Sequence, residues 1–198
     1  SVGITLSPKQ SAACRRQGLE AYVKDWKTLS PGELGAFDAV VSIGAFEHFC
    51  SPQELVRGEQ DAIYRRFFGL CRRLLPARGR LYLQTMVWGR NAVPYEAFSL
   101  KAPKDSDEYL LALLEKLYPG SWLPDGAEQI VRDADGFRPV SATSGRRDYI
   151  ATMNEWGRRN MRRRALRNPA LLLRLSTRYA VSRDFRYQVE CLARACNR

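Results

Sequence analysis

The chain has 198 residues, 45% of them hydrophobic and 27% charged, which is typical of a globular domain with a sizeable core and excludes a disordered chain. No stretch approaches the roughly 20 apolar residues of a membrane-spanning helix, and the N-terminus has no signal-peptide pattern. Five cysteines without a Cys-x-x-Cys pair and a single histidine argue against a disulfide framework and a metal site, so we expect a metal-free cytoplasmic protein.

The positive charge lies near the C-terminus. The whole chain carries +11, and residues 146–198 contain fourteen arginines, no lysine and four acidic residues, a net charge of +10. On electrostatics alone, such a region fits an anionic phospholipid surface or a nucleic acid, and an ordinary solvated helix face also fits.

The first helix begins after a short strand. In Ser7-Pro8-Lys9-Gln10, Ser7 is the expected N-cap, Pro8 takes the first helical position and Gln10 completes a capping box. Further along, apolar runs alternate with a helical pattern, which predicts an α/β fold with a parallel sheet covered by helices on both faces. The expected strands are residues 2–5, 21–23, 37–43 and 80–86, and the expected helix is 63–75.

Residues 88–128 interrupt this alternation. They contain prolines, aromatic residues and one short helical pattern over 107–117, which predicts a lid or substrate-covering insertion. Residues 138–142 are expected to form another strand. The basic region 146–198 is expected to be helical, with a new helix starting at Asn168-Pro169 and a stripe at helical spacing formed by Ile150, Met153, Gly157, Met161 and Ala165.

One run of residues has the pattern of an active site. The apolar strand Val40-Val41-Ser42-Ile43 ends at Gly44 and is followed at once by Glu47 and by His48, the only histidine of the chain. In an open α/β sheet, ligands bind just beyond the carboxyl ends of the strands. The run therefore predicts the floor of an active site.

This run resembles the cyclopropane fatty acid synthases and mycolic acid cyclopropane synthases. The resemblance implies a Rossmann-like class I methyltransferase sheet and transfer of a methyl group from S-adenosylmethionine to the double bond of an unsaturated fatty acyl chain, with a cyclopropane ring or a methyl branch as product. It also implies that residues 88–128 cover the lipid and that the C-terminal arginines dock on anionic headgroups at the inner membrane surface. A homo-oligomer is compatible with it.

The resemblance assigns cofactor-binding residues by their positions. The segment Thr5-Leu6-Ser7-x-x-Gln10 would line the ribose and adenine of S-adenosylmethionine. Asp25 and Trp26 would contact the edge of the adenine and stack on it, and Ile43 and Gly44 would lie near the methionine part of the cofactor. Structural explanations stand beside these roles, because a capping box accounts for Ser7 and Gln10, and a tryptophan at a strand end is often simply packed.

The resemblance also assigns the reacting groups. Glu47 would orient a bound bicarbonate as general base, Tyr149 would donate a hydrogen bond to the same anion, and Gly44 and Met86 would contribute backbone contacts. Gln84 stands where many family members have a histidine; its amide can form hydrogen bonds but cannot accept a proton. The alternatives are that Glu47 is a helix-start carboxylate and Tyr149 a half-buried aromatic.

The chain has no Gly-x-Gly-x-x-Gly turn, which the family places upstream of the first strand here. We therefore expect residues 1–198 to be a single partial methyltransferase domain, incomplete at both ends. A catalytically inactive remnant is one alternative. A nucleic-acid-binding or nucleic-acid-modifying protein is disfavoured, because amino-group methylases carry an Asn/Asp-Pro-Pro-aromatic motif where this chain has Gly44-Ala45-Phe46-Glu47.

Overall fold

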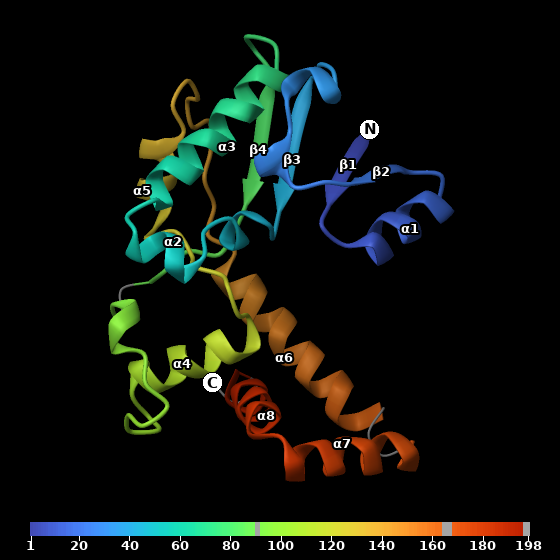
Figure 1. The fold of residues 1–198 in the computed structure, drawn as a ribbon, viewed down its shortest axis with the longest axis vertical. Coiled ribbons are helices and arrows are strands. Elements are labelled where there is room, and N and C mark those ends of the chain that lie inside the picture. Colours follow the sequence, from blue (N-terminus) through green and yellow to red (C-terminus); the bar gives the residue numbers. More distant parts are fainter. Residues whose placement is uncertain (90–91, 164–167, 196–198) are drawn as a thin grey trace. The chain divides into compact units, whose positions relative to one another are not determined.

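The computed structural model describes residues 1–89, 92–163 and 168–195 (Figure 1). The chain divides into two compact groups: residues 1–89 with 122–139, here called the first unit, and residues 90–121 with 140–198, the second unit. The single partial domain and its insertion at 88–128 stay predictions, and Ala165 of the expected helical stripe lies outside the described residues.

The first unit is an α/β structure with parallel strand pairs, as predicted. Strand β1 pairs in parallel with β2, and β3 pairs in parallel with β4. In the described residues these are two separate two-stranded sheets, whereas the sequence predicted one sheet. The elements are β1 (Val2–Thr5), α1 (Pro8–Arg16), β2 (Glu20–Val23), β3 (Ala39–Ile43), α2 (Pro52–Val56), α3 (Gln60–Leu74), β4 (Arg80–Gln84) and α5 (Ala127–Asp133).

Helix α3 lies along the β3–β4 pair and supplies most of the core of the first unit (Figure 1). Its buried side chains recur at helical spacing: Tyr64, Phe67, Phe68, Leu70, Cys71 and Leu74. The helix ends where Leu75 turns to an extended conformation ahead of Pro76, since a residue before proline disfavours the helical region. Gly79 then leads the chain into β4.

The expectation that β3 is covered on both faces is wrong. Ser42 is buried, but Val41 and Ile43 on the other face are 63% and 64% exposed, and their neighbour Tyr82 on β4 is also exposed. Side chains alternate between the two faces of a strand, so the pair buries one face and leaves the other open among the described residues. Apolar residues on both faces of a strand thus do not guarantee two covering layers.

Two further expectations also need correction. Residues 138–142 form no strand: Pro139 has no N–H to donate to a ladder, and Val140 is 72% exposed. The capping box of α1 is half formed, because the Ser7 side chain accepts a hydrogen bond from the Gln10 backbone as expected, but the Gln10 side-chain oxygen accepts from the Thr5 hydroxyl instead.

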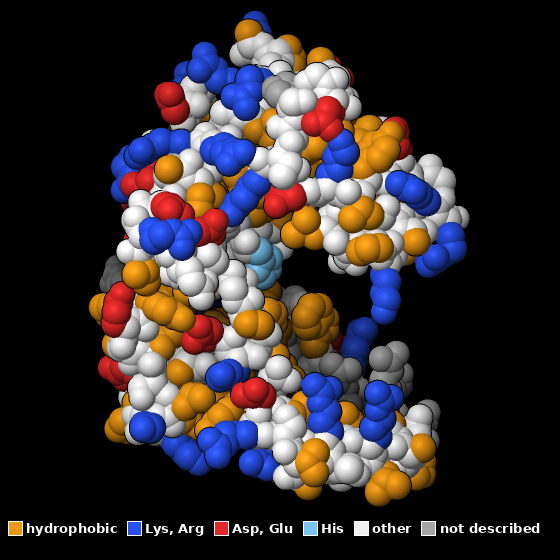
Figure 2. Space-filling view, in the orientation of Figure 1, with side chains coloured by type: hydrophobic (Ala, Val, Ile, Leu, Met, Phe, Trp, Pro, Cys, Tyr) orange, Lys and Arg blue, Asp and Glu red, His pale blue; other side chains and the backbone are white. Residues whose placement is uncertain are grey.

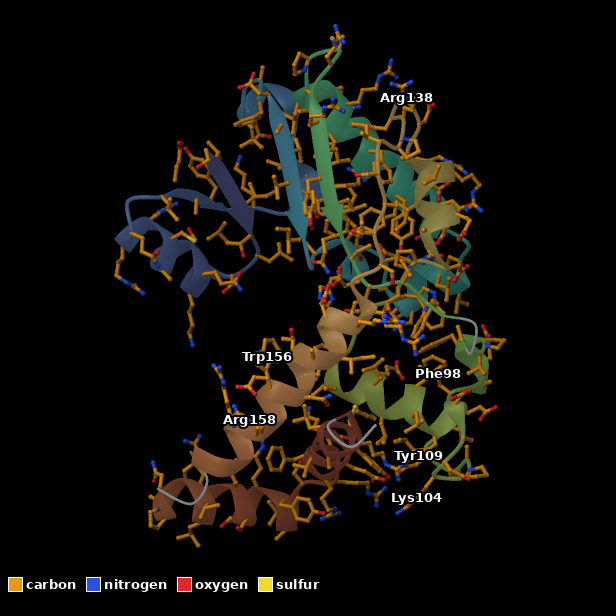
Figure 3. The ribbon with its side chains drawn as sticks, turned by 180° about the vertical axis from the view of Figure 1, so that it is seen from behind. Phe98, Lys104, Tyr109, Arg138, Trp156 and Arg158 are labelled. Atoms are coloured by element: carbon orange, nitrogen blue, oxygen red, sulfur yellow. The ribbon has the colours of Figure 1, made fainter. Side chains whose placement is uncertain are left out.

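The second unit is helical. It contains α4 (Asp107–Leu117), α6 (Arg146–Arg163), α7 (Pro169–Val181) and α8 (Arg183–Ala195), so the helices expected over 107–117 and from Asn168-Pro169 are confirmed. Helix α4 packs on α8 through Tyr109, Leu113 and Cys191. Tyr109, labelled in Figure 3, donates its hydroxyl to Glu190 at 3.0 Å. Within the described ranges, no helix is long and apolar enough to cross a membrane.

Candidate active site at the end of strand β3

A glycine turn connects β3 to the residues that follow it. Gly44 has φ +60°, a left-handed conformation that residues with a Cβ disfavour. Its N–H donates to the Gln84 carbonyl at 3.0 Å, so the contact between the strands extends one residue beyond β3. The chain then enters the short 3₁₀ helix η3 (Phe46–His48), which carries Glu47.

Phe46 anchors this turn in the core. Its ring is fully buried, stacks on Tyr64 of α3 with 4.4 Å between centroids, and meets Phe67 edge-on at 5.5 Å. Aromatic contacts of this kind add to the stabilisation from burial. Together with the hydrogen bond of Gly44, they fix where the next residue, Glu47, projects.

Glu47 is a buried carboxylate with a defined partner. It is only 3% exposed, and its Oε2 lies 2.8 Å from the Thr85 hydroxyl, which is also 3.1 Å from the Met86 carbonyl. A threonine hydroxyl has one proton to donate, so it serves one of these acceptors at a time. A carboxylate oxygen is a stronger hydrogen-bond acceptor than a backbone carbonyl.

Thr85 is the residue that sequence reasoning missed. It comes directly after β4, the strand parallel to β3, and the carboxyl ends of adjacent parallel strands lie at the same edge of a sheet. A polar residue directly after β4 was the sequence feature from which this contact could have been predicted. The predicted role of Met86 was a backbone contact, and its carbonyl is indeed beside Thr85, but its role in a reaction stays a prediction.

Gln84 and Ile43 are cross-strand partners in the β3–β4 register. Both are exposed, on the open face of the pair, because side chains alternate along a strand and Thr85 takes the opposite direction. The structure therefore brings Ile43 and Gln84 together, while it is Thr85 that contacts the Glu47 carboxylate. The predicted roles of Gln84 in the reaction and of Ile43 with the cofactor stay predictions.

The predicted cofactor residues near β1 form a local network. The Thr5 hydroxyl donates to the Gln10 side-chain oxygen at 2.6 Å and accepts from the Ser7 N–H at 3.1 Å. Thr5 thus has a structural role that the sequence did not indicate. Leu6, between them, is 71% exposed. These hydrogen bonds stabilise the turn between β1 and α1, in which the Leu6 side chain is exposed to solvent.

Asp25 and Trp26 follow β2. The Asp25 carboxylate accepts from the Lys27 N–H at 2.9 Å and caps the 3₁₀ helix η1 (Trp26–Thr28). Trp26 is half-buried against Phe49 and Phe67, with centroid distances of 4.8 and 5.5 Å. The packed-tryptophan alternative therefore describes its contacts in this structure, and adenine stacking stays a prediction.

An ion pair connects this turn to the segment after Glu47. Lys27 Nζ lies 2.8 Å from Glu54 of α2, and Glu54 also forms the capping box of that helix with Ser51. Partial burial acts to raise the pKa of the Glu54 carboxyl, but hydrogen bonds from Lys27 and Ser51 outweigh it and bring that pKa to about 2. Next to it, burial raises the pKa of the Cys50 thiol to about 12, so Cys50 is a packed thiol and not a nucleophile.

Tyr149 lies on α6 in the second unit, where it is 48% exposed. Its predicted pairing with an anion near Glu47 stays a prediction. In the described part of the chain, no group of three or more His, Cys, Asp or Glu side chains is placed to hold a metal ion.

Comparison with known families gives a match over most of the chain. The family profile described as "Mycolic acid cyclopropane synthetase" matches residues 1–175. This range includes both strand pairs and every residue assigned above to the candidate site.

Curated relatives come from mycobacteria. Hydroxymycolate synthase MmaA4 of Mycobacterium tuberculosis is 29% identical over 168 residues, covering 79% of this chain and 50% of that protein. Cyclopropane mycolic acid synthase 3 of the same species is 28% identical over 169 residues, covering 78% of this chain and 52% of that protein. Cyclopropane mycolic acid synthase 1 of Mycobacterium tuberculosis is 32% identical over 120 residues, covering 60% of this chain and 38% of that protein. The chain thus spans about half the length, or less, of these relatives.

Proposed function

Because the chain belongs to the mycolic acid cyclopropane synthetase family, we propose that it serves S-adenosylmethionine-dependent methyl transfer to the double bond of an unsaturated acyl lipid, a phospholipid or a related lipid. The product is a cyclopropane ring or a methyl branch. The observation that carries the proposal is the buried Glu47 carboxylate at the end of β3, held by Thr85. Two of the relatives are named as cyclopropane mycolic acid synthases, which supports a lipid substrate.

Features at the ends of β1 and β3 support an adenosyl cofactor. Leu6 and Ile43 offer exposed apolar surface there, and Gly44 lets the backbone approach a ligand without a Cβ. Bound S-adenosylmethionine supplies an electrophilic methyl group. The residues that would hold it are those the resemblance names: Thr5, Leu6, Gln10, Asp25, Trp26 and Ile43.

Glu47 is the group suited to proton removal. When an alkene gains a methyl group, the substrate becomes a cation, and closing a three-membered ring requires the loss of one substrate proton. The Glu47 carboxylate accepts this proton, and the Thr85 hydroxyl keeps the carboxylate oriented toward it. Positioned acid–base groups of this kind contribute about 10²–10⁴-fold to a rate.

The described contacts of Glu47 give no support to a bound bicarbonate, which stays a prediction. The Glu47 carboxylate and the Met86 carbonyl are acceptors, and the Thr85 hydroxyl has a single proton that these two already share. An anion needs donors. Tyr149 and Gln84 are the predicted donors, and Gln84 lies on the open face of β4, opposite to the direction of Thr85.

Calorimetric titration of the 198-residue chain with S-adenosylhomocysteine tests the cofactor site, with circular dichroism as the check on folding. Ile43→Gln and Val41→Gln form a matched pair, since both side chains are about equally exposed on β3 but only Ile43 is at the strand end. We expect micromolar binding by the wild type and by Val41→Gln, and weaker binding by Ile43→Gln.

No binding by a folded chain would contradict the proposed cofactor site and favour an inactive remnant. Equal weakening by both variants would show that the open face of β3, and not the strand end, affects binding. That result would also remove Ile43 from the site.

A further inference from the structure

Helix α7 exposes apolar side chains along its whole length. Among the described residues none of its side chains is buried, whereas α4 and α8 of the same unit share a core. Leu173 and Val181 are 71% and 79% exposed, and the remaining large apolar side chains are each more than one third exposed: Leu171, Leu172, Leu175 and Tyr179. Several exposed apolar side chains on one helix are typical of an interaction surface.

The helix is preformed and held by its neighbours. At its start, Asn168 accepts a hydrogen bond from the Leu171 N–H at 3.0 Å, and Pro169 follows at the first helical position. At its end, Arg186 of α8 donates to the Tyr179 and Ala180 carbonyls at 3.2 and 2.9 Å. These caps satisfy backbone groups at both ends, so the apolar surface belongs to an ordered helix and not to a loose terminus.

The charges on α7 are positive: the helix contains Arg174 and Arg178 and no acidic residue. In the first turn of α8, Arg183 and Arg186 flank Asp184, whose carboxylate lies 3.7 Å from Lys116 Nζ. Figure 2 shows blue and orange side chains side by side on the visible face of the segment that Figure 1 labels α7. Arg158 and Arg159 of α6 are paired with Glu155, whereas Arg178 of α7 lies over the Phe185 ring, 4.5 Å from its centroid.

This combination of leucines and arginines selects one kind of partner. A second copy of the chain would bring the same arginines face to face across a two-fold interface, with no acidic residue of α7 to offset them. An anionic bilayer surface satisfies both kinds of side chain, because leucines enter the headgroup–acyl boundary and guanidinium groups bind lipid phosphates. The helix has 13 residues, about 20 Å, and is too short to span a bilayer.

We propose that α7 lies in the plane of an anionic lipid surface, with Leu173 and Val181 in the apolar boundary and Arg174 at the phosphates. Helix α7 is then the docking element of the proposed lipid-directed function, on which this inference rests. Its test needs neither cofactor nor turnover, so the two can fail separately.

The experiment measures co-sedimentation of the 198-residue chain with vesicles of phosphatidylcholine alone and of equal parts phosphatidylcholine and phosphatidylglycerol. The test variant is Leu173→Gln and the matched control is Val140→Gln, at a side chain of the same unit that is equally exposed, at 72%. Neither substitution changes the net charge. Arg174→Gln tests the electrostatic part.

We expect binding to the anionic vesicles only. Leu173→Gln should weaken it roughly tenfold, because an apolar side chain no longer leaves water. Arg174→Gln should weaken it roughly fivefold, and Val140→Gln should leave it unchanged. Each variant should bind S-adenosylhomocysteine as the wild type does.

Equal binding to both kinds of vesicle, or equal effects of Leu173→Gln and Val140→Gln, would overturn the proposal. Sedimentation velocity provides the other decisive outcome. A dimer that Leu173→Gln converts to a monomer, with vesicle binding unchanged, would show that a second copy covers α7.

Discussion

The Thr85 hydroxyl lies 2.8 Å from the Glu47 carboxylate, although the two residues are 38 positions apart in the chain. Each follows the end of one strand of the parallel β3–β4 pair, so the register of the two strands determines that these side chains lie close together. Glu47 is buried, and a buried carboxylate is costly unless hydrogen bonds compensate it. The contact therefore contributes to folding as well as to the proposed chemistry.

Replacing Thr85 with valine removes the hydroxyl and keeps the shape of the side chain. The Glu47 carboxylate then loses a hydrogen-bond donor in a buried site, and the free energy of unfolding should fall by about 1–3 kcal/mol. Thr85→Ser retains the hydroxyl and should recover much of this loss. Urea denaturation measures all three proteins, and equal stability of the valine and serine variants would show that the hydrogen bond does not matter.

Glu47→Gln tests the proposed proton acceptor. The amide can still accept a hydrogen bond from Thr85, so the fold should be retained, but it cannot take a proton from the substrate. Turnover, measured as transfer of labelled methyl groups to an unsaturated phospholipid, should fall roughly a hundredfold. Turnover close to that of the wild type would remove Glu47 from the mechanism.

Gly44→Ala introduces a Cβ at a residue with φ +60°. The nearest atom to that Cβ would be a Glu47 oxygen at 3.8 Å, an ordinary contact, so the cost comes from the backbone conformation and not from a clash. We expect a loss of about 1–2 kcal/mol in the free energy of unfolding. Gly89→Ala is the control, because Gly89 has no positive φ and open space around it. Thermal unfolding of the two variants should differ clearly.

The Lys27–Glu54 ion pair should make stability depend on pH at the acidic end. The pKa of Glu54 is lowered from 4.5 to about 2 in the folded chain, so the stabilisation is fully present above pH 4.5 and is lost as the pH falls toward 2. Both side chains are partly exposed, which limits the effect to about 1 kcal/mol. Lys27→Met should be less stable than the wild type at pH 6 and nearly equal to it near pH 2.

Glu54→Gln supplies the control for this pH dependence, because it has no carboxyl to titrate at that position. Its free energy of unfolding should lack the contribution that the wild type loses between pH 4.5 and 2. A constant difference between Lys27→Met and the wild type across this range would contradict the assignment.

Local signals in the sequence were sufficient for several features. The Ser7 and Asn168 caps, the proline after α3 and the glycine that ends β3 act through backbone hydrogen bonds and dihedral preferences within a few residues. The turn into Glu47 was predictable for this reason. So was the parallel pairing of the strands, because strands alternating with helices favour it.

Contacts between distant segments were decided only by the tertiary structure. The sequence by itself determined that a strand ends at Gly44 and presents Glu47; the register of Ile43 against Gln84 decided that Thr85, and not Gln84, reaches that carboxylate. Only the folded chain shows that Val41 and Ile43 are exposed and that none of the described side chains of α7 is buried. Periodicity tells which side chains share a face, but burial depends on which other segments pack against that face, and this is a property of the whole chain.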